Sequence, residues 1–290
     1  MFSFGTLLSG LSIGSILLLV ALGLAIIYGT MGVINLAHGD FLMIGAYATW
    51  YLQKYWHMGL IATLPVVFIV GCIVGLVVEK TVVRYLYRRP LDTILATWGI
   101  SILLEEAVNL GAGSNLKYVQ LPGMLSGDWV LFGAHVGVYR ILIIGIALAL
   151  LIATSVLFFR TDFGLKVRAV VSNPETAEGH GVNSGLIYAA TFAYGSGLAA
   201  FAGALVAPIK SVSPTMGIHY IVDAFLVVVV GGVGSLLGLF VSAGIIGEME
   251  SIIGFAIDDT TAKVIIFLAV IAIIRFRPQG LFVSKVRQPS

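Results

Sequence analysis

The sequence has very few charged residues. Only 10% of its 290 residues are Asp, Glu, Lys or Arg, whereas soluble domains carry about 25%. Hydrophobic residues make up 59%, and no stretch is polar enough to form a separate soluble domain. The composition therefore excludes an ordinary soluble enzyme. It is typical of an α-helical protein that crosses a membrane several times.

Cysteine and the common catalytic motifs are also scarce. The single cysteine, Cys72, lies in an apolar run, so neither an internal disulfide nor a cysteine-based metal site can form. The sequence contains no G-x-x-x-x-G-K-[ST] phosphate loop, no H-E-x-x-H zinc motif and no G-x-S-x-G nucleophile motif. The first apolar run is too long for a signal peptide and lacks a preceding basic segment. We therefore expect a retained first helix and no catalytic or metal site.

Long apolar runs predict one all-α polytopic membrane domain over residues 1–290, with about eight or nine transmembrane helices, including short or broken ones. The predicted segments are Gly5–Tyr28, Phe41–Leu52, Leu60–Val78, Leu91–Leu110, Tyr139–Phe158, Ser184–Pro208, Ile221–Val230, Leu239–Phe255 and Thr261–Ile274. Within Ser184–Pro208, small residues recur every four positions, which indicates close helix packing.

Two glycine-rich segments interrupt this pattern. Gly29–Asp40 (GTMGVINLAHGD) and Gly231–Gly238 (GGVGSLLG) are too polar or too rich in glycine to be ordinary lipid-facing helices. We interpret both as breaks in helical structure at membrane depth, where irregular backbone must be covered by protein or by a water-filled cavity. Similar orders of elements at 5–90 and 221–278 suggest an internal repeat. Paired breaks of this kind indicate a substrate path near the midplane of the membrane.

Positive charges are concentrated in three polar segments, which predicts that these segments are cytoplasmic. Their members are Lys80, Arg84, Arg88 and Arg89; Arg160, Lys166 and Arg168; and Arg275, Arg277, Lys285 and Arg287. The loop 111–138 contains Lys117 as its only Lys or Arg, so we expect it to be external. The same rule places the C-terminus in the cytoplasm.

The polar segment 160–183 (RTDFGLKVRAVVSNPETAEGHGVN) has the features of a folded loop. Gly164 is expected to end one short segment, and Asn173 and Pro174 provide a capping side chain and a first helical residue. Gly179 and Gly181 can end that helix after about two turns. A short helix held on the cytoplasmic face is suited to receive movement from a soluble partner.

The polar residues of NLAHGD form the sharpest candidate site within the membrane. Asn35, His38 and Asp40 could line a substrate path or gate, or they could serve only to pair the broken backbone. Catalysis is disfavoured, because no Ser or Cys nucleophile has a recognisable context here.

Two further groups of polar residues lie on predicted helices. Thr97, Ser101 and Glu105 are spaced by four and share a helix face, with Trp98 beside it. They could line a path for a hydrogen-bonding solute, or the glutamate could lie at the external interface. Glu248 lies in an apolar helix, where an ionisable group is costly, so we expect either path lining or a paired position.

Over essentially its whole length, the chain resembles the permease subunits of ATP-binding-cassette importers of the branched-chain amino acid type, and four segments carry the resemblance. They are Gly23–Tyr47 (GLAIIYGTMGVINLAHGDFLMIGAY), Gly179–Gly185 (GHGVNSG), Val227–Gly238 (VVVVGGVGSLLG) and Arg277–Phe282 (RPQGLF). Within that family, Leu95–Glu106 (LATWGISILLEE) and Ile221–Leu236 (IVDAFLVVVVGGVGSL) look most like the permease of bacterial urea importers.

The resemblance implies a subunit of an assembly in the inner (plasma) membrane of a bacterium. Its partners would be a second, homologous permease, two cytoplasmic ATPases and an extracytoplasmic solute-binding protein. ATP and Mg²⁺ would be bound by the ATPases, so this chain would be neither an enzyme nor a cofactor-binding protein. The segment 160–183 would couple it to an ATPase. The coupling residues would be Arg160, Lys166, Arg168, Asn173, Pro174, Glu175, Glu178 and Gly181.

The substrate implied by the resemblance is urea, with branched-chain amino acids or short amides as the alternative. A passive channel for small solutes is the main alternative from another class, because half-helices can also meet at a selectivity filter. It predicts flux without ATPase partners.

Overall fold

The computed structural model describes residues 4–87, 89–131, 134–277 and 280–281. Helices dominate these residues, and the only other regular structure among them is a short antiparallel hairpin of β1 (Asp128–Leu131) and β2 (Ala134–Gly137). In chain order the helices are α1 (Phe4–Met31), α2 (His38–Trp56), α3 (Leu60–Thr81), the 3-10 helix η1 (Val83–Tyr85), α4 (Pro90–Ala112), α5 (Val138–Arg160), α6 (Asp162–Ser172), α7 (Pro174–Gly179), α8 (Ser184–Val206), α9 (Met216–Gly231), α10 (Leu236–Ala256) and α11 (Asp259–Phe276).

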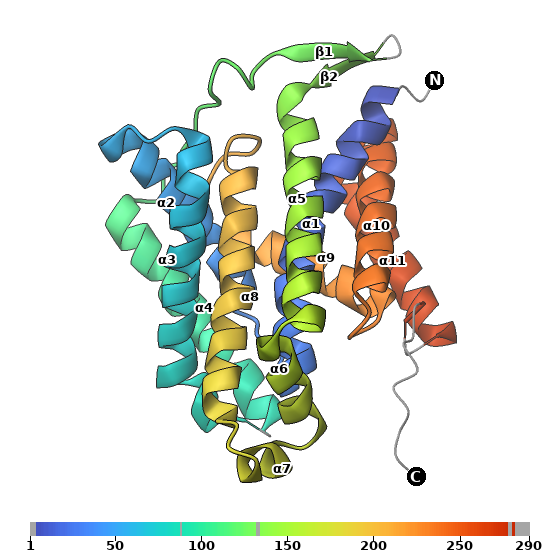
Figure 1. The fold of residues 1–290 in the computed structure, drawn as a ribbon. Coiled ribbons are helices and arrows are strands. Elements are labelled where there is room, and N and C mark those ends of the chain that lie inside the picture. The colour runs from blue at the N-terminus through green and yellow to red at the C-terminus, as the bar shows by residue number, and fades with distance from the viewer. Residues whose placement is uncertain (1–3, 88, 132–133, 278–279, 282–290) are drawn as a thin grey trace.

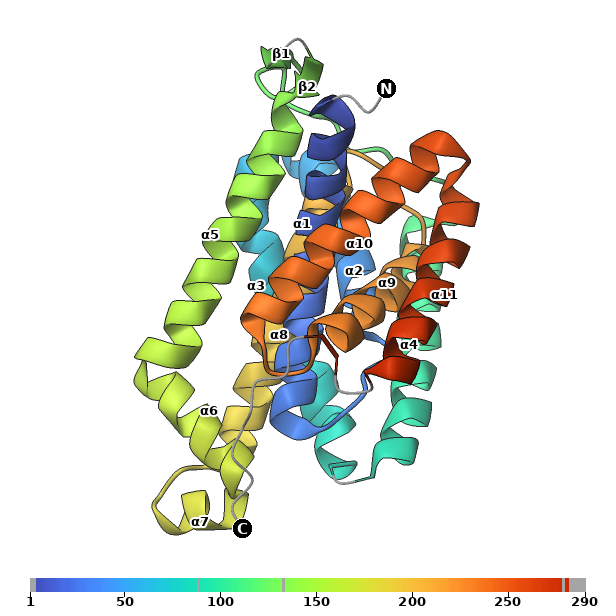
Figure 2. The ribbon, with the colours of Figure 1, turned by 90° about the vertical axis from the view of Figure 1, so that its right-hand side faces the viewer.

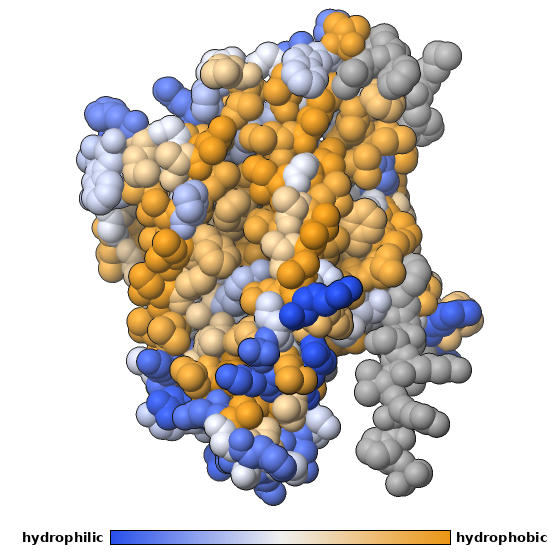
Figure 3. Space-filling model, viewed as in Figure 1, coloured by the Kyte–Doolittle hydropathy of each residue, from blue (hydrophilic) through white to orange (hydrophobic). Residues whose placement is uncertain are grey.

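The long helices form a bundle with two distinct ends (Figures 1 and 2). The hairpin end carries β1, β2 and the start of α1, and the α7 end carries α6 and α7. Six helices in the described part of the chain are long and apolar enough to cross a membrane: α1, α3, α4, α5, α8 and α10. A broad apolar band separates hydrophilic patches at the two ends of the face in Figure 3. These features confirm the predicted class, an all-α polytopic membrane protein.

The first predicted break is present, but it is shorter than expected. α1 continues to Met31, and α2 begins at His38 and runs for 19 residues. The chain turns back on itself between them, because His38 Nε2 lies 3.0 Å from the carbonyl oxygen of Val20, in the middle of α1. α2 therefore begins deep inside the bundle.

The second predicted break lies between α9 and α10. Gly232 and Gly234 both have positive φ angles there, +83° and +94°, which glycine adopts without strain. The starts of α2 and α9 meet in the bundle, because the backbones of Gly39 and Gly217 are in direct contact. The two parts of the predicted internal repeat share the order of their elements but not the lengths, since α1 has 28 residues and α9 has 16.

The helix α8 lies among α1, α2 and α3, against which it packs (Figure 1). Gly203 of α8 lies directly against the carbonyl oxygen of Leu42, and Gly195 lies against that of Gly23. A side chain at Gly203 would collide with backbone alone, and one at Gly195 would collide with the Gly23 carbonyl and with the Ile27 side chain. The predicted close packing of Ser184–Pro208 is therefore confirmed.

A segment near the C-terminus closes the second break. The Leu281 N–H donates to the carbonyl oxygen of Val230, at 2.8 Å, and Gly280 (φ +85°) packs against Gly232. These two residues belong to the RPQGLF motif, whose Pro278, Gln279 and Phe282 lie outside the described residues, as do Arg88, Lys285 and Arg287.

Two expectations were wrong or incomplete. Gly164 does not end a segment: it lies inside α6, buried against the backbone of Phe158, and its lack of a side chain allows this contact. The loop 111–138 contains the β1–β2 hairpin, which its turn-forming residues did not predict.

Gly203→Ala tests the close packing of α8. We expect a loss of about 1–3 kcal/mol in stability, because the added methyl group would meet the Leu42 carbonyl. Gly99→Ala is the matched control, since a side chain at Gly99 of α4 would meet nothing within 4 Å. Thermal unfolding of the detergent-solubilised protein would measure both. Equal stability of the two variants would contradict the packing described here.

Candidate functional site

The backbone between α1 and α2 is held by side chains from two directions. Asn35 Oδ1 accepts a hydrogen bond from the Ala37 N–H at 3.1 Å, which supports the turn into α2. The Leu36 N–H donates to Thr97 Oγ1 of α4 at 3.1 Å. Asn35 and Thr97 are both fully buried. Some of the polar side chains of NLAHGD therefore pair the backbone groups that the helix break leaves free, which is one of the two roles expected for this segment.

His38 and Asp40 occupy the first turn of α2. The contact between His38 Nε2 and the Val20 carbonyl requires a proton on Nε2, because the carbonyl can only accept. Asp40 is only 1% exposed, and neither carboxylate oxygen has a hydrogen bond of ordinary geometry among the described residues, although the Ser101 hydroxyl is directed at the carboxyl group. Ser101 and Glu105 of α4 face this carboxyl group. The structure thus brings Asp40 together with the predicted polar face of α4.

These residues define what we call the α2–α4 interface: Asn35, Asp40 and Tyr47 on one side and Thr97, Ser101 and Glu105 on the other. Four of these side chains have a buried polar atom without a partner in the described part of the chain: Asn35 Nδ2, both oxygens of Asp40, the Tyr47 hydroxyl and Glu105 Oε1. Buried polar groups are normally paired, so such a group requires a specific explanation. A row of them along one interface indicates a place where water, a solute or another subunit completes the pairing.

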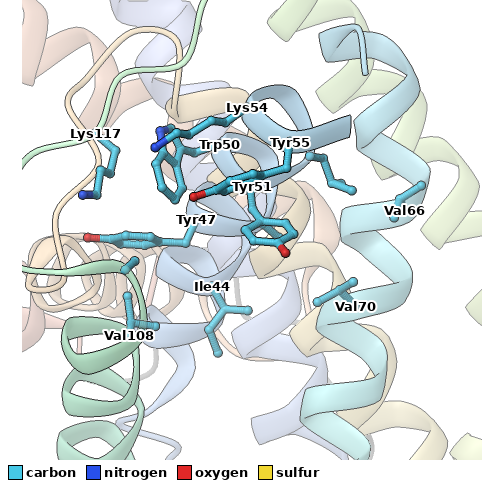
Figure 4. A pocket seen from close by; sticks show the side chains of 14 residues that line it. Ile44, Tyr47, Trp50, Tyr51, Lys54, Tyr55, Val66, Val70, Val108 and Lys117 are labelled. Carbon is cyan, nitrogen blue, oxygen red and sulfur yellow. The ribbon is translucent and has the colours of Figure 1, made fainter. Parts of the chain in front are cut away.

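A cavity of about 540 Å³ lies where this interface approaches the hairpin end. Aromatic residues of α2 line it, and the Lys54 ammonium and the Lys117 ammonium lie 4.8 and 5.2 Å from the Trp50 ring centroid (Figure 4). Tyr47 extends beneath Lys117 toward the cavity (Figure 4). The far end of the interface therefore combines positive charge with aromatic surface.

The loop that carries Lys117 is fixed in place by backbone contacts. Lys117 and Val212 exchange two hydrogen bonds of 2.9 Å, and the Gln53 side chain forms two more with the backbone of Gln120. Sequence reasoning missed Tyr47, Trp50 and both lysines. Tyr47 follows Asp40 by seven residues, or two helical turns, and this spacing was the available signal.

Besides His38, whose ring is directed at Val20 of α1, two predicted path residues lie away from the α2–α4 interface. Trp98 is 57% exposed and points to the outside of α4. Glu248 lies at the contact between α1 and α10, against Gly10, where its Oε1 has no partner among the described residues. The structure therefore does not bring either residue together with Asn35 and Asp40.

The segment 160–183 folds into two helices at the α7 end (Figures 1 and 2). Asn173 Oδ1 accepts from the Thr176 N–H at 2.9 Å and caps α7, with Pro174 as its first residue, which confirms the predicted helix start. Gly181, with φ at +83°, follows the helix. A small hydrophobic cluster made by Val167, Val170, Ala177 and Ile187 holds the two helices against the start of α8.

Most predicted coupling residues are exposed on this pair of helices. Arg160, Lys166, Asn173, Glu175 and Gly181 are accessible at its surface. Two others have structural contacts, because the Arg168 guanidinium donates to the Phe158 carbonyl and Glu178 accepts from the Ser184 hydroxyl. Three large apolar side chains at this end are also exposed: Leu165, Val171 and Leu186. The segment is thus a folded projection with a mixed apolar and charged surface.

Comparison with known proteins agrees with this architecture. Residues 6–274 match the family described as "Branched-chain amino acid transport system / permease component". The chain is 28% identical to the high-affinity branched-chain amino acid transport system permease protein BraD of Pseudomonas aeruginosa, over 95% of this chain and 94% of that protein.

Two similar proteins come from one organism, Salmonella typhimurium. The branched-chain amino acid permease protein LivH is 27% identical over 94% of this chain and 93% of its own length. The permease protein LivM of the same transport system is 24% identical over 79% of this chain and 59% of its own length. No solved structure matches the chain significantly.

Thr97→Val tests whether α4 supports the break. Valine has the shape of threonine but cannot accept the Leu36 N–H, so a buried donor would lose its partner at a cost of about 1–3 kcal/mol. Thr97→Ser keeps the hydroxyl group and is the matched control. We expect a lower thermal unfolding temperature for the valine variant alone. If both variants unfold at the temperature of the parent protein, the hydrogen bond does not support the break.

Proposed function

Because the chain belongs to the family of branched-chain amino acid transport system permease components, we propose that it is one of two permease subunits of an ATP-driven importer. It forms half of the translocation path, and its solute is a branched-chain amino acid. The observation that carries this proposal is the row of unpaired buried polar groups along the α2–α4 interface.

The exposure of α4 supports a second permease subunit as the neighbour of this interface. Although Thr97 and Ser101 are buried, most of α4 is not: Leu91, Leu95 and Leu103 are between 64% and 76% exposed. An ionisable group within a membrane requires water or protein as its neighbour instead of lipid. A path between two such subunits would provide such neighbours for Asp40 and Glu105. The similarity to both LivH and LivM, two permease proteins of one organism, favours a pair of homologous but different subunits.

The charges at the two ends of the α2–α4 interface suit a zwitterion better than urea. Asp40 and Glu105 can face an ammonium group, and Lys54 and Lys117 can face a carboxylate on the way in. The names of the similar proteins favour the same class of solute. Urea, which the sequence resemblance predicted, has no comparable support, so the amino acid alternative becomes our main proposal.

The α6–α7 projection is the proposed contact with a cytoplasmic ATPase. Cations lie at the α7 end on Lys80, Arg84, Arg89 and Arg275 as well as on α6, which by the positive-inside rule favours a cytoplasmic α7 end and a cytoplasmic C-terminus. ATP and Mg²⁺ would be bound by the two ATPases and not by this chain. The solute-binding protein would then deliver the solute to the hairpin end, and ATP-driven motion would expose the path to alternate sides.

Uptake of radiolabelled L-leucine into proteoliposomes tests the proposed function. The vesicles would contain this chain with its second permease, ATPases and binding protein, with and without ATP. We expect ATP-dependent leucine uptake that excess urea does not reduce. ATP-dependent urea uptake that leucine leaves unchanged would return the assignment to urea. Equal flux through this chain alone, without ATP, would instead establish a passive channel.

Glu175→Lys tests the coupling role of α7. Glu175 is exposed and makes no hydrogen bond or ion pair among the described residues, so its reversal changes the surface without breaking the fold. We expect leucine uptake per ATP hydrolysed to fall by about fivefold or more. A fivefold change corresponds to a loss of roughly 1 kcal/mol of contact energy between α7 and the ATPase. Asp128→Lys, a reversal at an exposed position of β1 at the hairpin end, is the control. Unchanged uptake per ATP in the Glu175 variant would remove α7 from the coupling surface.

A further inference from the structure

A second and larger cavity lies elsewhere in the chain, toward the hairpin end. It has a volume of about 720 Å³ and is enclosed by α1, the connection between α8 and α9, and the helices α9, α10 and α11. Figure 2 shows α9, α10 and α11 on the side of the molecule that faces the viewer, with α1 behind α10. The volume is within the range of about 300–1,000 Å³ that is usual for small-molecule sites.

The residues that line this cavity carry balanced charges. Three are carboxylates and three are cations: Asp223, Glu250 and Asp259, and Arg140, Lys210 and Lys263. Lys263 Nζ donates to Asp223 Oδ2 at 2.6 Å, which joins α11 to α9. Such a set attracts neither anions nor cations strongly, but it can hold a molecule that carries one charge of each sign.

Glu250 is the residue of this set that most needs an explanation. It lies on α10, a mostly apolar helix that can span a membrane and whose only other ionisable residue is Glu248, and an ionisable side chain is costly there. The charged groups that face it are Asp223, Asp259, Lys263 and Lys210. Because Asp223 already pairs with Lys263, Lys210 remains for Glu250, and Lys210 makes no side-chain hydrogen bond or ion pair among the described residues.

The wall that α1 contributes is largely apolar. Ile13, Ile16 and Leu17 lie there beside Ser9 and Ser12, together with Val206 at the end of α8. A ligand with two opposite charges and an aliphatic part would therefore find a complementary surface for each of its groups.

The first turn of α9 separates this cavity from the α2–α4 interface. Met216 lines the cavity and is buried, whereas the next residue, Gly217, packs against Gly39 and close to Asp40. The two sites are therefore adjacent but distinct, with one turn of helix between them.

We propose that this cavity binds a free zwitterionic amino acid with an aliphatic side chain, with Glu250 facing its ammonium group and Lys210 its carboxylate. The permease then contributes to solute selection itself and does not leave it to a binding protein. The class of ligand rests on the proposed function, whereas the location and the charge balance of the site do not.

Equilibrium binding of tritiated L-leucine tests this proposal. The assembled permeases and ATPases would be placed in lipid nanodiscs without ATP and without the binding protein. We expect saturable leucine binding that is at least about tenfold tighter than binding of 4-methylpentanoate or 3-methylbutylamine, each of which lacks one of the two charged groups.

Two pairs of variants locate the binding. Glu250→Gln and Lys210→Met should each weaken leucine binding about tenfold or more. Their matched controls are Glu106→Gln and Lys80→Met, at exposed positions outside the cavity, which should bind leucine as the parent complex does. Thermal unfolding would verify that all four variants are folded. Leucine binding that survives both cavity substitutions, or that Asp40→Asn abolishes while Glu250→Gln does not, would overturn the proposal.

The outcome is separable from that of the uptake experiment. ATP-dependent leucine uptake without any effect of the cavity variants on binding would overturn this inference and leave the transport function intact. Leucine binding that depends on Glu250 and Lys210, in a complex without ATP-dependent uptake, would support the site and contradict the transport function.

Discussion

Every polar backbone group that is removed from water needs a partner, and in this protein two helix breaks put that requirement in the middle of an apolar bundle. The first break is paired by Asn35, by Thr97 of α4 and by the contact of His38 with Val20. The second is closed by Leu281. The position of α4, which has few other contacts with the bundle, follows from the pairing of the first break.

Glycine and alanine set the spacing between helices around these breaks. Because Gly39 and Gly217 allow α2 and α9 to touch through their backbones, the two helices begin side by side at the same depth. Polar side chains near the start of each helix then diverge, with Asp40 directed toward α4 and Asp223 toward α11. Close packing at one point thus creates two separate polar regions in a chain with few charges.

Much of the fold could be predicted from the sequence, whereas the direction of side chains could not. Apolar run lengths located the long helices within a few residues, and the Asn173–Pro174 pair located the start of α7. The direction in which each side chain points was harder to predict, because a helix that is apolar on all sides gives little periodic signal. Glu248 and Glu250 show this: two residues correspond to about 200° of helix rotation, so one faces α1 and the other faces the charged cavity.

The cavities themselves were beyond sequence reasoning for a different reason. Lys117 reaches Trp50 only because its loop pairs with Val212, and Lys210 reaches the neighbourhood of Glu250 from a separate connection. Such contacts join segments that are far apart in the chain and have no spacing rule. By contrast, Thr97, Ser101 and Glu105 were predicted together because they belong to one helix face, and they do lie at one interface.

The hydrogen bond from Leu281 to Val230 also fixes an order of events during biosynthesis. The helices α1, α2, α3 and α8 can pack together as soon as residue 206 has left the ribosome, since their mutual contacts need nothing that follows. The break between α9 and α10 cannot close until residue 281 has been synthesised. While the chain is being inserted, the carbonyl of Val230 must therefore be hydrated or held by the insertion machinery, so this region is the last part of the described chain to become fully paired.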